Sequence, residues 1–515
     1  MLSIHAAPLS RSGRRLPIAM ARRQIKLEAL IQRATAGKQF NRHTLFRPSL
    51  SYYLLKDPFW LWCEHHAPKN AAVDETTRYE ELRMQQGVEY ESRWVKANFP
   101  QAVEIKPSFG FSALKNTFGA MLDGASAIYQ PQLWDLARDS YGKGDLLVRD
   151  DTAASDLGPF HYRVVEIKRS KLLQNSHVLQ AAFYTQNIGM LQGYAPREFT
   201  VVLKDSAENV GFGGKERDLE AARQLWIGLR DGSVLPEMKR PPNAANSPWR
   251  QYANQRAHDE RDLVLLAGIV KRERDKLRQA GIQKVDQLWT LCQEEVNEII
   301  GDHYGEIAYQ VAQAYKIGGP IVKPGQQLKI PRAKRLLYFD FETCDSVYPS
   351  EPPHTYLIGC YDGSRDRFVK FLARGAEDEG RIFSEFLDYI GDPRDVCLYH
   401  WTDFEIHQMR GVARRWPLLP TMFEQVIEKC VDLKQAIQSA VYLPVPSFSI
   451  KCVAPALGFH WRQKDIGAYQ SMVCYWDYLE NRDLFAIDRA LIYNEDDCMA
   501  MWHVDQALRK RLQTS

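Results

Sequence analysis

The stretch Leu-Leu-Tyr-Phe-Asp-Phe-Glu-Thr, residues 336–343, decides the fold of the last third of the chain. Its apolar side chains predict a buried β-strand. Asp340 and Glu342 are two residues apart near its end, so both project from the same face of that strand. A buried strand accepts two acids on one face only where they are paired or bind a cation. The stretch therefore predicts a core strand that carries a metal site.

The residues around this stretch alternate between strand and helix patterns. Strands are expected at 335–341, 355–361, 367–372 and 395–400, with a helix at 376–390 and mostly helical residues after 400. Such alternation is typical of an α/β domain in which helices cover a sheet. We therefore expect an α/β domain over residues 333–515.

Two later segments bring further acids toward this strand. Tyr493 and Asp497 lie four residues apart on an expected helix, so they share one of its faces. Residues 399–405 end a strand and begin a helix that carries Glu405. Carboxylates from three elements can hold two metal ions about 4 Å apart, which supports in-line phosphodiester hydrolysis, and a tyrosine hydroxyl can orient the attacking water. The acids expected at this site are Asp340, Glu342, Glu405 and Asp497.

The order of these motifs resembles the DEDD exonucleases of the ribonuclease H-like superfamily, in the branch with tyrosine in the last motif. The resemblance implies a 3′–5′ exonuclease in which the four acids bind Mg²⁺ or Mn²⁺ and Tyr493 is catalytic. The wider family has Asn-x-x-x-Phe-Asp in its middle motif, whereas this chain has His400-x-x-x-Phe404-Glu405. His400 is accordingly assigned to substrate binding, and Asp403 stays the alternative to Glu405 as third ligand. A degenerate domain that binds without cutting is the competing interpretation.

The segment between the second and third motifs fits the same resemblance. Residues 444–451 and 457–459 resemble the stretch that these domains carry there. Several aromatic residues follow. Their side chains can stack nucleobases, although core packing is the more frequent role of such aromatics. These residues are Tyr469, Tyr475, Trp476 and Tyr478.

A second group of charged residues lies in the first half of the chain. An expected strand over residues 162–168 places Glu166 and Lys168 on one face, and Asp145 begins the preceding strand. Mg²⁺ binds through a few carboxylates and keeps several waters, which suits such a pair of acids. The lysine can activate a metal-bound water or stabilise charge on a scissile phosphate. A solvated strand edge is the alternative interpretation.

Two flanking helices extend this pattern. An expected helix at 75–98 carries Glu91, and one at 176–192 places Gln180 and Tyr184 one turn apart. A carboxylate helix, two strands and a Gln-x-x-x-Tyr helix, in that order, resemble the RecB-like branch of the PD-(D/E)XK nucleases. The resemblance implies metal binding by Glu91, Asp145 and Glu166, catalysis by Lys168, and DNA contact or bracing by Gln180 and Tyr184.

The nine cysteines are scattered, odd in number and lack a Cys-x-x-Cys pair. They therefore predict neither a disulfide framework nor a zinc ribbon, and a reducing cytoplasm is the expected compartment. Some RecB-like relatives hold an iron–sulfur cluster with one early and three late cysteines. Here only Cys63 precedes the expected nuclease core, and the next cysteine is Cys292. We therefore expect no iron–sulfur cluster.

A helical module is expected between two linkers rich in Pro, Gly or Asn, at 232–249 and 318–331. A helix that ends at Gly281 before Ile282 fits a left-handed stop. A helix pair joined by a tight glycine turn can present backbone N–H groups to phosphates. The module resembles the helix-hairpin-helix modules of DNA repair proteins, and the basic residues at 271–278 favour DNA. A plain packing hairpin is the alternative.

Composition agrees with a multidomain protein. At 515 residues the chain predicts about three domains. Charged residues make up 25% and the net charge is +3, so overall charge neither requires nor excludes nucleic acid. No apolar run approaches the ~18–20 residues of a spanning helix, so no membrane partner is expected. Residues 1–44 are basic, and we favour a solvated extension, or a start at Met20, over a transit peptide or a tail that contacts nucleic acid.

The sequence thus predicts an α/β multidomain protein. The expected parts are a basic extension at 1–44, a RecB-like PD-(D/E)XK nuclease domain at 45–240, a helix-hairpin-helix-like module at 255–318 and a ribonuclease H-like exonuclease domain at 333–515. The expected function is metal-dependent DNA hydrolysis in repair or processing, with two candidate sites, DNA preferred over RNA and a possible helicase partner. The alternatives are a nucleic-acid-binding scaffold with one degenerate site and an RNA-directed 3′–5′ exonuclease.

Overall fold

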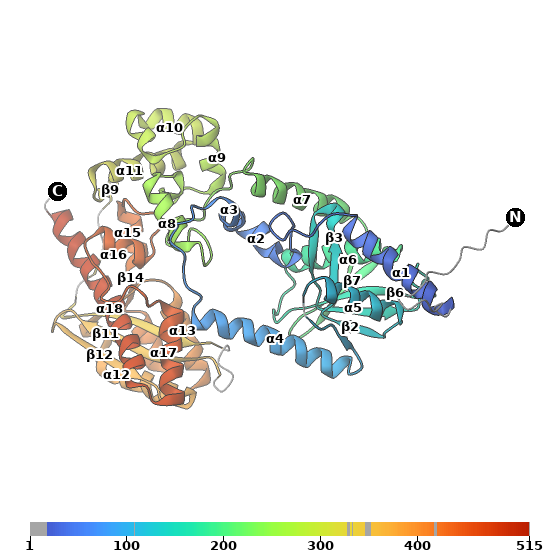
Figure 1. Ribbon diagram of the computed structural model, residues 1–515. Coiled ribbons are helices and arrows are strands. Elements are labelled where there is room, and N and C mark those ends of the chain that lie inside the picture. Colours follow the sequence, from blue (N-terminus) through green and yellow to red (C-terminus); the bar gives the residue numbers. More distant parts are fainter. Residues whose placement is uncertain are drawn as a thin grey trace. The chain divides into compact units, whose positions relative to one another are not determined.

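The computed structural model describes residues 18–107, 109–326, 330–331, 333–345, 352–416 and 420–513. The chain divides into two compact units (Figure 1). Unit 1 comprises residues 1–70 and 84–237, and unit 2 comprises residues 71–83 and 238–515. Among the helices that the structure describes, none is both long and apolar enough to cross a bilayer.

A six-stranded sheet in the order β1-β2-β5-β6-β7-β8 forms the centre of unit 1. Strand β6 pairs antiparallel with β5 and parallel with β7, and it is buried along nearly its whole length. The strands are β1 (Val103–Glu104), β2 (Ala127–Tyr129), β5 (Leu146–Asp150), β6 (His161–Ile167), β7 (Glu198–Val202) and β8 (Ala207–Gly211), with a separate hairpin of β3 (Gln132–Asp135) and β4 (Ser140–Lys143). Leu146 of β5 lies opposite Val165 of β6, so the predicted acids of both strands lie at one end of this pair.

Helices of unit 1 surround the sheet. Val95 and Trp94 of α4 pack on the side of β6 that carries Val165 and Ile167, whereas α6 contacts β6 and β7. The helices are α1 (Ile18–Thr35), α2 (Ser51–Lys56), α3 (Pro58–His66), α5 (Phe111–Leu122), α6 (Asn175–Gln192), α7 (Glu216–Asp231) and α4 (Arg78–Asn98), of which residues 84–98 belong to unit 1. Helices α2 and α3 are separated at Asp57, because the following Pro58 disfavours a helical conformation of the residue before it.

The described part of the basic N-terminal segment is a packed helix, which corrects the prediction of a solvated extension. Leu30 and Ala34 of α1 are buried. Arg23 pairs with Asp123 at 2.9 Å, and Arg33 lies 2.7 Å from Asp156. The apolar residues on one side of α1 were obscured in the sequence by the many basic residues between them. The arginines serve here as partners of acids in unit 1.

The helical module belongs to unit 2. It contains α8 (Arg250–Asp259), α9 (Lys271–Gln279), α10 (Gln293–Ile300) and α11 (Asp302–Ile317). The predicted stop after α9 is present, since Gly281 has a φ of +87°. Four of the five basic residues of α9 are paired with acids of the same module: Lys271 with Asp275, Arg272 and Lys276 with Glu273, and Arg278 with Asp262. These pairs reduce the charge that α9 offers to a phosphate backbone.

The second sheet of the molecule, in unit 2, has five strands in the order β12-β11-β10-β13-β14. Central strand β10 pairs antiparallel with β11 and parallel with β13. The strands are β10 (Arg335–Cys344), β11 (His354–Asp362), β12 (Arg367–Leu372), β13 (Val396–His400) and β14 (Cys430–Asp432). The first four confirm the strands predicted from the sequence. A short pair of β9 (Ile321–Val322) and β15 (Val441–Tyr442) lies apart from this sheet.

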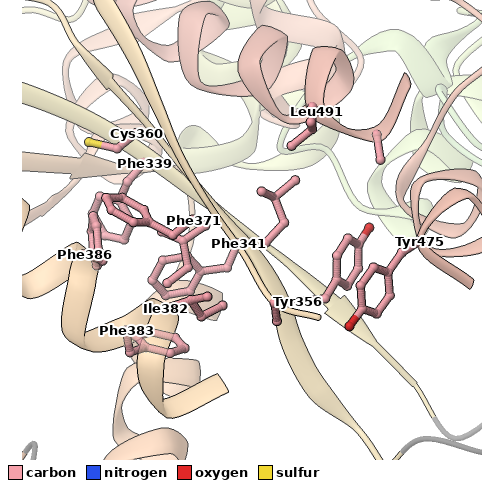
Figure 2. Packing of buried hydrophobic residues seen from close by; sticks show 14 of the residues in the cluster. Phe339, Phe341, Tyr356, Cys360, Phe371, Ile382, Phe383, Phe386, Tyr475 and Leu491 are labelled. Atoms are coloured by element: carbon pink, nitrogen blue, oxygen red, sulfur yellow. The ribbon is translucent and has the colours of Figure 1, made fainter. Parts of the chain in front are cut away.

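Helices cover both faces of this sheet. Helix α12 (Glu379–Ile390) contacts β11 and β12, whereas α17 (Ala468–Asn481) and α18 (Leu484–Gln513) contact β10. The remaining helices are α13 (Phe404–Arg415), α14 (Pro420–Ile427), α15 (Leu433–Ala440) and α16 (Ile450–Ala456). Figure 2 shows Phe339 and Phe341 of β10 beside Phe383 and Phe386 of α12, and Tyr356 beside Tyr475 of α17.

This packing fixes the direction of the acids on β10. Successive residues of a strand point to opposite faces, and Phe339 and Phe341 point toward α12. Asp340 and Glu342 therefore point to the face covered by α17 and α18. The sheet thus turns the acids of its central strand toward the long C-terminal helix.

Candidate active site

Three carboxylates of unit 2 converge on one point. Asp340 and Glu342 of β10 and Asp497 of α18 each place one oxygen so that all three atoms lie within 4.8 Å of one another. They line a pocket of about 280 Å³. Carboxylate oxygens are the ligands preferred by hard divalent cations. This donor set fits such an ion.

The electrostatics of this acid cluster also favour a cation. Burial raises the pKa of Asp340 well above its usual range, and the neighbouring Glu342 and Asp497 raise it further. Burial likewise raises the pKa of Glu342, with Asp497 as the main neighbouring cause. Like charges so close together oppose ionisation, whereas a bound cation reverses this effect and favours the carboxylate forms.

Glu405 lies in the first turn of α13, next to this cluster. It is buried, and burial raises the pKa of Glu405 to about 7. Its Oε2 has no hydrogen-bond partner among the described residues. Asp403, the alternative ligand, is exposed at the start of the helix. Glu405 does not belong to the three acids whose oxygens lie within 4.8 Å of one another. Because Glu405 is buried beside this cluster, it is favoured over the exposed Asp403 as a further acid ligand.

Three side chains that sequence reasoning missed contact the cluster. Lys451 of α16 forms an ion pair with Oδ1 of Asp497, and the Trp461 indole donates a hydrogen bond of 2.7 Å to the same oxygen. The Asn494 amide donates to Oδ2 of Asp340 at 2.9 Å. The only sequence signals were the position of Lys451 in the stretch at 444–451 and that of Asn494 next to Tyr493.

Tyr493 lines the same pocket and is nearly fully buried. Burial raises its pKa, and Asp497 and Glu342 raise it further, so the hydroxyl keeps its proton. The Lys451 ammonium lies 4.2 Å from the centre of the Tyr493 ring and 4.2 Å from the Trp461 ring. A protonated hydroxyl beside the acid cluster can donate a hydrogen bond to a water or to a phosphate oxygen.

The charged residues predicted in unit 1 also lie together. Lys168 Nζ is 3.4 Å from Glu166 Oε1 and 3.6 Å from Asp145 Oδ2. Burial raises the pKa of Glu166 well above its usual range, with Asp145 as a further cause. Glu166 Oε2 has no hydrogen-bond partner among the described residues. Burial raises the pKa of Glu91, and the neighbouring Asp145 raises it further. The Glu91 carboxylate accepts a hydrogen bond of 3.2 Å from Gln130.

The three residues assigned to substrate binding are all buried. Gln180 donates to Glu166 Oε1 at 3.2 Å, and Tyr184 packs so closely on Gly142 that an added Cβ there would lie 2.7 Å from its hydroxyl. His400 hydrogen-bonds through Nδ1 to the Thr402 carbonyl and lies 3.7 Å from Glu405. These positions favour bracing of the acids over direct contact with a substrate.

The comparison with known families concerns unit 2. Residues 337–509 match the RNase_H_2 family of the RNase_H superfamily. Asp340, Glu342, Glu405 and Asp497 all lie inside the matched range. No curated protein matches the chain closely enough to count as a relative. The C-terminal part is thus a ribonuclease H-like domain, and its superfamily indicates a nuclease that binds nucleic acid and uses divalent metal ions.

Proposed function

We propose that the chain is a metal-dependent nuclease that hydrolyses phosphodiester bonds of DNA at the acid cluster of unit 2. The convergence of Asp340, Glu342 and Asp497 within 4.8 Å, inside the segment that matches the RNase_H superfamily, carries this proposal. The finer assignment is a DEDD-type 3′–5′ exonuclease with Glu405 as the fourth acid. DNA repair or processing is the proposed setting.

The proposed cofactor is Mg²⁺ or Mn²⁺, held by these acids. When bound, such an ion polarises a scissile phosphate and lowers the pKa of a bound water. Lys451 and Trp461 both hold Oδ1 of Asp497 and so fix the direction of that carboxylate. Asn494 orients Asp340 in the same way. Tyr493 donates its proton in a hydrogen bond that aligns the attacking water.

A digest of end-labelled single- and double-stranded DNA with Mg²⁺ or Mn²⁺ tests the proposal. Asp340→Ala should abolish the release of mononucleotides, because it removes one acid of the cluster. Asp488→Ala is the matched control, since Asp488 is an exposed acid on α18. Unchanged release by Asp340→Ala would overturn the assignment.

A second active site in unit 1, of the RecB-like PD-(D/E)XK type, is the second candidate. The supporting observation is that Glu166 is fully buried beside Asp145 and Lys168 with Oε2 lacking a partner among the described residues. A buried carboxylate oxygen of this kind fits a metal ligand. Lys168→Ala should abolish oligonucleotide products and leave DNA binding intact, whereas the exposed Lys171→Ala should change neither.

Two alternatives stay open to test. A chain that binds nucleic acid but stays inert with both metals would be a scaffold with degenerate sites. RNA that competes more strongly than DNA at a stated salt concentration would favour the RNA-directed exonuclease. Several expectations stay predictions: a phosphate-binding role of the helical module, a helicase partner and a cytoplasmic location. The same holds for the domain boundaries, which are 1–44, 45–240, 255–318 and 333–515.

A further inference from the structure

A short upstream segment is built into unit 2. Residues 71–83 belong to this unit although they lie far from it in the sequence. The Asp74 amide donates to the Pro248 carbonyl at 2.8 Å, and Arg78 forms an ion pair with Asp477 of α17. Leu82 packs against the core of the ribonuclease H-like domain. Backbone, charged and apolar contacts thus hold this segment on the domain.

Tyr79 is the residue of this segment that reaches the acid pocket. Its side chain is only 6% exposed. The hydroxyl donates to Asp345 Oδ2 at 2.8 Å, and the ring stacks on Tyr469 with centroids 4.3 Å apart and planes 13° apart. Asp345 and Tyr469 both line the pocket that contains Asp340. Tyr79 therefore fixes two parts of the pocket wall.

Tyr469 is the exposed partner of this stack. It lies at the start of α17 and is 56% exposed, although it borders the acid cluster. An exposed aromatic ring held by a buried ring loses little freedom on binding, so it is preorganised for a flat ligand. Nucleobases stack on such rings with little dependence on sequence.

We propose that Tyr469 is a stacking platform for a nucleobase of the strand that enters the acid cluster, and that residues 71–83 complete this subsite through Tyr79. Tyr469 touches the substrate, whereas Tyr79 is a positioning residue. The inference rests on the proposed function, because it takes nucleic acid as the ligand of the pocket. It also means that a fragment restricted to residues 325–515 lacks part of the substrate site.

The test uses full-length chains that also carry Lys168→Ala, so that products come from unit 2. Single-stranded DNA is supplied intact or with one abasic nucleotide placed at successive positions from the 3′ end. Tyr469→Ala should raise KM about tenfold, the size of one lost base stack, with kcat changed less than about twofold. One abasic position should raise KM in the parent chain and lose its effect in Tyr469→Ala.

Two further variants separate positioning from folding. Tyr79→Phe keeps the ring but removes the hydrogen bond to Asp345, and we expect a smaller rise in KM than for Tyr469→Ala. Tyr79→Ala should raise KM as much as Tyr469→Ala. Phe485→Ala, which removes a 75% exposed ring outside the pocket, and Tyr442→Phe, which removes a 2.7 Å hydrogen bond to Glu306, are matched controls with unchanged KM.

Binding of a fluorescein-labelled oligothymidylate, with Ca²⁺ in place of Mg²⁺, separates the stacking role of Tyr469 from the proposed nuclease activity. Suppose that the parent chain cuts DNA and that Tyr469→Ala has the same KM, the same affinity and the same dependence of KM on the abasic position. The stacking role of Tyr469 is then wrong, whereas the nuclease assignment holds. If the parent chain is inert but Tyr469→Ala weakens binding relative to Phe485→Ala, the platform stands and the nuclease is wrong.

Discussion

Trp461 and Asp497 are joined by a hydrogen bond of 2.7 Å from the indole Nε1 to the carboxylate Oδ1. The Lys451 ammonium forms an ion pair with the same oxygen. Both donors lie in the segment between β15 and α17, whereas Asp497 lies on α18. The segment between the second and third acid motifs therefore determines how the last acid is presented to the pocket.

Removal of the indole donor should reduce activity more than stability. Trp461→Phe keeps an aromatic ring but loses the hydrogen bond to Asp497. A hydrogen bond to a charged group is worth roughly 2 kcal/mol, so we expect kcat to fall about tenfold or more. Trp289→Phe is the control, because it loses an indole hydrogen bond of 2.8 Å to Ala312 in the helical module. Equal kcat values for both variants would contradict the role of Trp461.

Removal of the Lys451 ammonium should make the stability of the folded state depend more on a divalent metal ion. The Lys451 ammonium lowers the pKa of Asp340 and Glu342 against the larger effect of burial. In Lys451→Met this compensation is lost, so thermal unfolding should show a larger gain in Tm on addition of Mg²⁺ than in the parent chain, equivalent to about 2 kcal/mol.

Lys323→Met is the control for this measurement. The Lys323 ammonium lies 4.7 Å over the Tyr442 ring, away from the acid pocket. Its replacement removes a similar contact between a cation and a ring without changing the charge at the acids. A gain in Tm that is the same in both variants would show that Lys451 does not compensate the cluster.

The features that the sequence predicted best depend on short-range periodicity. Asp340 and Glu342 share a face because residues two apart on a strand always do, and the apolar residues around them identified that strand as buried. Gly281 was predicted as a helix stop because a left-handed conformation there favours glycine. Neither inference needed knowledge of the tertiary packing.

The features that the sequence did not predict depend on contacts between distant segments. Lys451 and Trp461 reach Asp497 from residues 46 and 36 positions away. Tyr79 meets Asp345 across 266 positions. The burial of Gln180, Tyr184 and His400 likewise follows from how helices pack on the sheets. No local pattern distinguishes such residues from ordinary core or surface positions.

The packing of α1 gives a prediction about stability. Leu30→Ala should lower the free energy of unfolding of unit 1 by about 3 kcal/mol, because it removes a side chain that is only 3% exposed. Ile25→Ala, on the exposed side of the same helix, should change it by less than about 0.5 kcal/mol. Urea unfolding followed by tryptophan fluorescence measures both. A solvated N-terminal extension would instead give equal, small effects.

The buried Glu405 predicts how stability depends on pH in the metal-free protein. Its pKa of about 7 lies above the value expected for an unfolded chain, so the folded state binds more protons between these values. Its contribution to stability is then fully present at low pH and is lost as the pH rises through about 7. In Glu405→Gln this contribution does not titrate, so the free energy of unfolding in the presence of a chelator should fall less steeply over the same interval. Asp403→Asn, which changes an exposed acid two residues earlier, should leave the slope unchanged. A slope in Glu405→Gln equal to the parent's would contradict the raised pKa of Glu405.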